Sequence, residues 1–323
     1  MSQQAPRTET FSELFDHICA NVRLAVRGKD EVIRLMVLCL VAEGHLLIED
    51  APGVGKTSLA KALAASMDGT LGRIQFTPDL LPGDVTGISV WNRATGDFDF
   101  RPGPVFNNIV LGDEINRASP KTQSALLEAM AEKQVTVDGS TRQLAPPFMV
   151  IATQNPIEHE GTYVLPEAQL DRFLMRVSVG YPDRDAEIDI LTTLDDGDST
   201  ASLSPVVTAE NVRAMSKAVN SVHVAPSLRN YMVDLAAATR NHPSLALGMS
   251  PRAVLALQRI TRTAAAAAHR DHVIPDDLKA MAQPTLAHRL MLTPEAQLQG
   301  VSAGQVLKEI LNGLPVPTAP GLA

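Results

Sequence analysis

The chain has 323 residues, of which 45% are hydrophobic and 20% are charged. At roughly 150 residues per domain this length predicts about two domains, and the composition excludes a chain that stays disordered. The formal net charge of −8 gives no overall attraction for nucleic acid or for an anionic membrane, although it leaves room for a local basic channel.

The first half of the chain alternates between helical and strand patterns. Apolar residues at helical spacing predict helices over 11–26, 31–42 and 58–66. Short apolar runs predict strands at 46–48, 108–112, 148–152 and 173–179. Such alternation is typical of an α/β fold with a mostly parallel sheet and helices on both faces.

Two stretches do not fit a minimal α/β unit and are predicted to be insertions. The first, 77–105, is rich in proline and glycine. The second, 134–147, alternates between polar and apolar residues and then offers Asp138-Gly139, a favoured two-residue turn, so it predicts a β-hairpin.

Beyond residue 185 the strand signals stop. A polar segment, 186–205, is predicted to link the first domain (1–185) to an all-helical second domain over 206–312. The helices of this second domain are predicted at 210–221, 227–241, 252–269 and 276–292. The proline-rich residues 313–323 are predicted to form a flexible tail.

The cysteines and the apolar segments indicate the compartment. Cys19 and Cys39 lie in apolar, helix-like stretches without a CxxC partner, so they are predicted to be small core residues in a reducing compartment. The longest apolar run, 35–42, is far shorter than the ~20 residues that a bilayer requires. The sequence therefore predicts a cytoplasmic protein without membrane insertion.

A phosphate-binding loop is predicted between the first strand and the helix that follows it. In the segment 50–57, DAPGVGKT, glycines allow backbone N–H groups to converge on an anion, Lys56 can reach the β- and γ-phosphates, and the Thr57 hydroxyl can hold Mg²⁺. The motif usually begins with glycine, and here Asp50 takes that place. The predicted nucleotide-binding residues are Gly53, Val54, Gly55, Lys56, Thr57, Ser58 and Asp113.

Polar side chains follow two later strands, at the edge of a parallel sheet where ligands collect. Asp113 would hold Mg²⁺ together with Thr57, and Glu114 could polarise an attacking water. Asn155 could orient that water, although Asn155-Pro156 in isolation also indicates a turn.

Two arginines are further candidates. Ser250-Pro251 reads as the start of a helix, and a cation in its first turn, Arg252, is disfavoured by the helix dipole unless an anion lies nearby. A solvated or salt-bridged Arg252 is the alternative. Arg172 lies at the edge of the last predicted strand and could simply pair with Asp171.

The ordered motifs APGVGKT, VLGDEINRASPKTQSALLEAMAE, ATQNPIEHEGTYVLPEAQLDRF and SPRA resemble those of the MoxR family of AAA+ ATPases. The resemblance runs from about residue 28 to residue 292. It implies a P-loop core with a parallel five-stranded sheet, a C-terminal helical lid, and a homo-oligomeric ring, usually a hexamer, with ATP between neighbouring subunits.

The resemblance also implies roles for individual residues. Asp113 and Glu114 correspond to the Walker B pair, Asn155 to sensor 1, Arg252 to sensor 2 and Arg172 to the arginine finger that acts on the neighbour's ATP. Arg117 is a second candidate for that trans-acting role. Segment 77–105 corresponds to the helix-2 insert and segment 134–147 to the pre-sensor-1 hairpin, parts that are expected to face a pore or a client.

Proteins of this family look like chaperones that use ATP to remodel or mature other proteins, often beside a partner with a von Willebrand factor A domain. The leading hypothesis is therefore an ATPase with Mg²⁺ as cofactor that acts on a client protein. An ATP-gated assembly scaffold is the alternative. A nucleic-acid motor is disfavoured by the net charge and by an aromatic content of 4%, although Lys133 and Arg142 near the hairpin leave it open.

Overall fold

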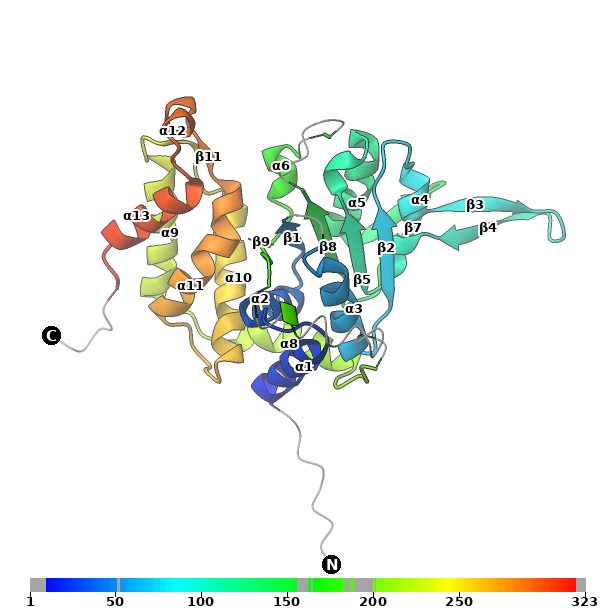
Figure 1. Ribbon diagram of the computed structural model, residues 1–323, viewed down its shortest axis with the longest axis horizontal. Helices are drawn as coiled ribbons and strands as arrows, with labels where there is room; N and C mark the ends of the chain where they lie inside the picture. Colours follow the sequence, from blue (N-terminus) through cyan, green and yellow to red (C-terminus); the bar gives the residue numbers. More distant parts are fainter. Residues whose placement is uncertain are drawn as a thin grey trace, which may run out of the picture.

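The computed structural model describes residues 10–50, 53–155, 162–163, 165–182, 184, 187–188, 200 and 202–317. They form an α/β core with a helical region on one side, and a two-stranded ribbon extends from the other side (Figure 1). The N-terminal residues 1–9, most of the predicted linker 186–205 and the end of the predicted tail, 318–323, lie outside the described residues.

The core contains most of the strands, together with short 3-10 helices labelled η. Its elements are α1 (Phe11–Ala25), α2 (Asp30–Val41), β1 (Leu46–Glu49), α3 (Lys56–Ser66), β2 (Leu71–Gln75), α4 (Pro82–Thr86), β3 (Gly87–Asn92), β4 (Asp97–Pro102), η1 (Pro104–Phe106), β5 (Ile109–Asp113), η2 (Ile115–Arg117), α5 (Pro120–Glu132), β6 (Gln134–Val137), β7 (Ser140–Gln143), β8 (Met149–Gln154), α6 (Glu167–Leu170) and β9 (Met175–Val177).

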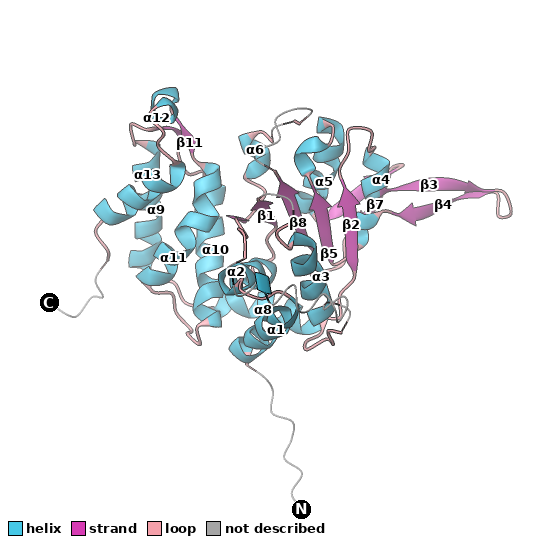
Figure 2. Cartoon of the chain, in the orientation of Figure 1, coloured by secondary structure: helices cyan, strands magenta, loops and turns pink. Residues whose placement is uncertain are grey.

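Five parallel strands form the main sheet in the order β2-β5-β8-β1-β9. Because successive side chains of a strand point to opposite faces, each strand feeds two cores. Leu46 and Ile48 of β1 face the core that α1, α2 and α3 complete, while Leu47 faces the core of α5. Helices therefore cover both faces of the sheet, as the alternating pattern predicts (Figures 1 and 2).

Both predicted insertions contain a β-hairpin. The hairpin predicted within 134–147 is confirmed as β6 and β7, joined by Asp138 and Gly139, whose φ angles of 50° and 73° suit a tight two-residue turn. The insertion 77–105 holds α4, η1 and the longer hairpin β3–β4, which forms the projecting ribbon in Figure 1. The residue pattern of 77–105 does not predict this second hairpin.

The C-terminal region is helical, as predicted, apart from one short pair of strands. Its elements are α8 (Ala209–Ala218), η4 (Val219–Ser221), α9 (Pro226–Arg240), β10 (Leu245–Leu247), α10 (Pro251–Ala267), α11 (Pro275–Leu286), η5 (Ala287–Arg289), β11 (Met291–Leu292), α12 (Pro294–Leu298) and α13 (Ala303–Gly313). The helix predicted over 276–292 ends at Leu286, because the chain then turns through η5 to pair β11 with β10. Helix α13 was not predicted.

The cysteines are core residues, as predicted. Cys19 and Cys39 are free and buried. Burial raises the pKa of the Cys19 thiol to about 11 and raises that of Cys39 further, so both stay protonated at neutral pH. Within the described part of the chain, no helix combines the length and the apolar character needed to span a membrane.

Candidate functional site

The described residues of the loop between β1 and α3 have the backbone geometry of a phosphate-binding loop. Gly53 and Gly55 have φ angles of 85° and 91°, which glycine adopts without a steric cost. A Cβ atom added to either glycine would have no other heavy atom within 4 Å, so both face open space. Helix α3 begins directly afterwards at Lys56 and directs its N-terminal N–H groups to the same place.

Lys56 lies across the mouth of this loop. Its Nζ donates a hydrogen bond to the backbone oxygen of Asp50 at 2.7 Å. Burial lowers the pKa of Lys56, and the charges of Asp50, Asp113 and Glu114 oppose that shift. The ammonium group thus lies half-buried among three carboxylates, where a bound anion would add to the forces that keep it charged.

Asp113 ends β5, and an arginine of β2 holds its carboxylate. Nε and Nη2 of Arg73 both lie 2.9 Å from Oδ2 of Asp113. The Thr153 hydroxyl, at the end of β8, contacts Oδ1 at 3.5 Å. The ends of three neighbouring strands therefore meet at one carboxylate.

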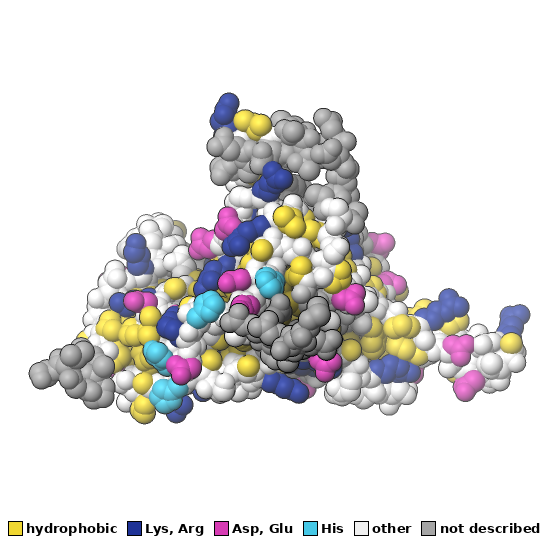
Figure 3. Space-filling view, turned by 90° about the horizontal axis from the view of Figure 1, so that it is seen from below, with side chains coloured by type: hydrophobic (Ala, Val, Ile, Leu, Met, Phe, Trp, Pro, Cys, Tyr) yellow, Lys and Arg dark blue, Asp and Glu magenta, His cyan; other side chains and the backbone are white. Residues whose placement is uncertain are grey.

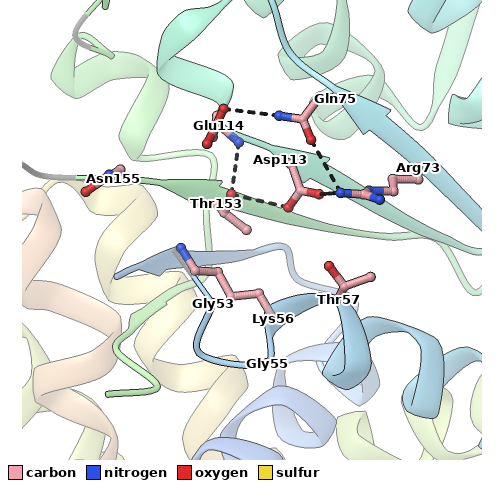
Figure 4. A pocket seen from close by; sticks show the side chains of 10 residues that line it. All are labelled: Gly53, Gly55, Lys56, Thr57, Arg73, Gln75, Asp113, Glu114, Thr153 and Asn155. Atoms are coloured by element: carbon pink, nitrogen blue, oxygen red, sulfur yellow. Dashed lines mark hydrogen bonds and ion pairs between the residues drawn. The ribbon is translucent and has the colours of Figure 1, made fainter. Parts of the chain in front are cut away.

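Glu114 adopts a backbone conformation that is uncommon for residues other than glycine. Its φ is 58°, and its N–H donates to Oγ1 of Thr153 at 2.9 Å. Its Oε2 accepts hydrogen bonds from Gln75 and Arg117, each at 3.1 Å. Such conformations cluster at functional sites, and here it turns the carboxylate toward the space above the loop (Figure 4).

These side chains enclose one cavity of about 230 Å³, here called the phosphate cavity (Figure 4). The predicted residues that line it are Gly53, Gly55, Lys56, Thr57, Asp113, Glu114 and Asn155. Of the other predicted loop residues, Val54 is buried in the hydrophobic core and Ser58 lies on α3 outside the lining.

Three lining residues were missed: Arg73, Gln75 and Thr153. Arg73 and Gln75 belong to β2, a strand that the sequence patterns did not reveal because LGRIQ has no continuous apolar run. Thr153 follows directly on a predicted strand. Its position at the carboxyl end of that strand was the available signal.

The donor set suits Mg²⁺. The Thr57 hydroxyl and the Asp113 carboxylate both line the cavity, and hard oxygen donors of this kind are what Mg²⁺ prefers. Among the residues that the structure describes, no separate group of histidine, cysteine and acidic side chains has the arrangement of a metal site.

A second cavity of about 330 Å³, here called the arginine cavity, lies between the core and the C-terminal helices. Its charged lining residues are Glu43, Lys133, Asp171, Arg172, Arg252, Arg259 and Arg289. Cations thus outnumber carboxylates, and Glu43 is already shared between Lys133 and Arg259.

Arg172 and Arg252 both face the arginine cavity and not the phosphate cavity. Within the described residues, neither guanidinium makes a hydrogen bond or an ion pair. Asp171, which was the alternative partner considered for Arg172, pairs with Arg289 instead. Arg252 therefore lines a different cavity from the P-loop of its own chain, and its role as sensor 2 stays a prediction. Two unpaired guanidinium groups in one cavity indicate a site for an anion.

Comparison with known proteins places this geometry in a family. Residues 45–175 match the model of the ATPase family associated with various cellular activities (AAA), and residues 237–310 match the AAA lid domain. The chaperone MoxR1 of Mycobacterium tuberculosis is 38% identical over 305 residues, which cover 92% of this chain and 80% of MoxR1. This chain belongs to the MoxR family of AAA ATPases.

Other relatives agree over nearly the whole chain. The uncharacterized protein YeaC of Bacillus subtilis is 48% identical over 309 residues, 96% of this chain and 97% of YeaC. The crystal structure of a candidate ATPase from Cytophaga hutchinsonii, 37% identical, superposes with a TM-score of 0.89 and covers 95% of this chain and 96% of that one. The P-loop core and helical lid implied by the sequence motifs are thereby confirmed.

Proposed function

We propose that this MoxR-family protein hydrolyses ATP to ADP and phosphate in the phosphate cavity and uses the cycle to remodel or mature a client protein. One observation carries the proposal. The anion-binding loop with Lys56 and Thr57 opens onto the same cavity as Asp113, Glu114 and Asn155. A site that only bound nucleotide would not need a carboxylate aimed at the space beside the phosphates.

Each residue that lines the phosphate cavity would have its own role in the reaction. Lys56 and the loop N–H groups bind the phosphates, and Thr57 and Asp113 would hold Mg²⁺, which neutralises charge on the β- and γ-phosphates. Glu114 accepts a proton from the attacking water, while Asn155 orients that water. Because Arg73 contacts Asp113 and Gln75 contacts Glu114, both carboxylates are held in place before substrate arrives.

The arginine cavity supports an assembly in which subunits share sites. Arg172 and Arg252 line the arginine cavity and do not line the phosphate cavity of their own chain, so we propose that both act on the nucleotide of a neighbouring subunit. A closed ring, by the family resemblance a hexamer, would place every phosphate cavity against an arginine cavity. A client and a partner with a von Willebrand factor A domain would complete the assembly.

A nucleic-acid motor gains no support from the face of the molecule that Figure 3 draws. On the face drawn in Figure 3, basic and acidic side chains of the described residues are interspersed, without a basic stripe that could follow a phosphate backbone. We therefore propose a protein client.

Two substitutions test the hydrolytic site. Lys56→Ala is expected to abolish ATP binding, whereas Glu114→Gln should bind ATP and hydrolyse it at least ~10²-fold more slowly, because only the proton acceptor is lost. Glu128→Gln, an exposed carboxylate on α5, is the matched control and should turn over normally. Normal turnover by Glu114→Gln would show that another group activates the water.

Mixing variants tests the shared site. Alone, Lys56→Ala should be inactive and Arg172→Ala should keep only a residual rate, about 10³-fold below wild type. Mixed rings contain interfaces with an intact Lys56 on one side and an intact Arg172 on the other, and should recover about a quarter of the wild-type rate. The same mixture with Arg252→Ala tests the second arginine. A mixture that stays inactive would place that arginine on its own chain's nucleotide.

A further inference from the structure

Arg289 is a buried charge that the proposed reaction does not use. It is 7% exposed, at the end of η5 in the lid. Burial lowers its pKa to about 10, the Asp171 carboxylate opposes that shift, and the charge of Arg252 adds to it. Burying a guanidinium is costly, so its position calls for a role.

Arg289 contacts His288 within the lid at 3.3 Å, and its two terminal nitrogens contact the core. Nη1 lies 3.0 Å from Oδ1 of Asp171, and Nη2 donates to the backbone oxygen of Phe173 at 2.7 Å. Asp171 and Phe173 are the two residues on either side of Arg172. Arg289 therefore holds the backbone that carries Arg172 from both sides, and it does so from the lid.

Asp171 also contacts the start of helix α10, which carries Arg252. The Ser250 hydroxyl contacts Oδ2 of Asp171 at 3.4 Å, and the same hydroxyl caps α10 by accepting from the N–H of Ala253 at 3.1 Å. Arg252 lies in the first turn of that helix. One carboxylate thus connects the core segment that bears Arg172 with the lid helix that bears Arg252.

We propose that Asp171 and Arg289 are positioning residues that hold Arg172 and Arg252 side by side, so that both reach one anion at once. This inference rests on the proposed function, because it takes that anion to be the nucleotide of a neighbouring subunit. The carboxylate of Asp171 also opposes the unfavourable effect of the Arg252 charge on Arg289. Movement of the lid would then carry both arginines together.

The test measures ATP turnover in Asp171→Asn and Arg289→Gln, both close in size to the native side chains. Because a displacement of about 1 Å can cost ~10²-fold in rate, we expect kcat to fall about 10- to 100-fold while ATP affinity, set by the same chain's P-loop, changes by less than about twofold. Arg289→Lys keeps the charge and should recover part of the loss.

A matched control separates positioning from stability. Arg270 and Asp277 form another ion pair of the same types within the lid, away from the arginine cavity. Arg270→Gln and Asp277→Asn should lower thermal stability but leave kcat unchanged. If they reduce kcat as much as Asp171→Asn does, the effect is general weakening of the lid and the proposal fails.

The deciding measurement is whether the effect of Asp171→Asn on kcat depends on the presence of Arg172 and Arg252. In an Arg172→Ala, Arg252→Ala background, Asp171→Asn should cause less than about a twofold further loss, because the groups that it positions are absent. An undiminished loss there, or wild-type kcat in the folded single variants, overturns the proposal while leaving the ATPase in place. If wild-type protein neither binds nor hydrolyses ATP, the proposed function fails first and this inference fails with it.

Discussion

Asp50 occupies the place where a P-loop usually has its first glycine, and its replacement gives a sharp prediction. The structure does not need glycine there, because Asp50 is not among the residues with positive φ. Its carboxylate Oδ2 instead accepts hydrogen bonds from the Ser178 hydroxyl at 2.9 Å, from the N–H of Gly180 at 2.7 Å and from the N–H of Val179. It thereby ties the start of the loop to the chain that leaves β9.

The size of the effect follows from these contacts. Hydrogen bonds to a charged group contribute about 1.5–3 kcal/mol each, and the half-exposed site lets water replace part of that, so Asp50→Ala should lower the free energy of unfolding by about 3 kcal/mol. Asp50→Asn keeps an acceptor oxygen and should cost about 1 kcal/mol. Ser178→Ala removes one neutral donor and should cost about 0.5 kcal/mol.

Urea unfolding measures these differences in the free energy of unfolding. If the slope of this free energy against urea concentration is unchanged, the shift of the midpoint reports stability. ATP affinity should fall in parallel, since Lys56 is hydrogen-bonded to the Asp50 backbone. A cost below about 1 kcal/mol for Asp50→Ala would refute the reasoning, because it would mean that water satisfies the two N–H groups as well as the carboxylate does.

Three further predictions concern pH, packing and assembly. Burial lowers the pKa of His45 to about 4, with Nδ1 accepting from one backbone N–H and Nε2 facing a carbonyl oxygen. As pH falls from about 6.5 toward 4, the unfolded chain takes up a proton that the folded chain refuses, so urea unfolding should show a loss of about 3 kcal/mol that His45→Gln lacks. A Cβ on Gly44 would lie 2.5 Å from Cβ of the buried Leu174, so Gly44→Ala should lower the free energy of unfolding by about 1–3 kcal/mol. A Cβ on Gly313 would meet nothing within 4 Å, so Gly313→Ala should be neutral in the same assay. ATPase rate per subunit should rise with protein concentration, and a constant rate from a monomer would contradict shared sites.

The sequence was most informative where one local pattern implies one local structure. The run Leu46 to Ile48 followed by GVGKT predicted a buried strand that leads into a glycine-rich turn, and Asp138-Gly139 predicted a hairpin. Strand β2 was missed because its exposed Arg73 and Gln75 line the phosphate cavity. These polar residues interrupt the apolar run by which strands are recognised.

The β3–β4 ribbon was missed for a different reason. Aromatic residues of β4 alternate with aspartates, but glycine and proline on both sides of the ribbon resemble a loop. The ribbon projects from the core, so its Trp91 and Phe98 pack on each other, with ring centroids 5.1 Å apart, and stay about half exposed. Hydrophobic patterning predicts burial, and it is a poor guide where an insertion remains at the surface.

The placement of Arg252 depends on how the lid packs, which no local pattern encodes. Motifs at 171–173 and 250–252 identify two arginines, but the packing of the lid on the core, which includes the contacts of Asp171 with Ser250 and Arg289, places them in one cavity. A chain with both arginines in its own phosphate cavity could complete the reaction alone. This chain instead has a phosphate cavity and a separate arginine cavity. Under the proposed function, complete catalysis then requires a neighbour, and this geometry couples hydrolysis to assembly.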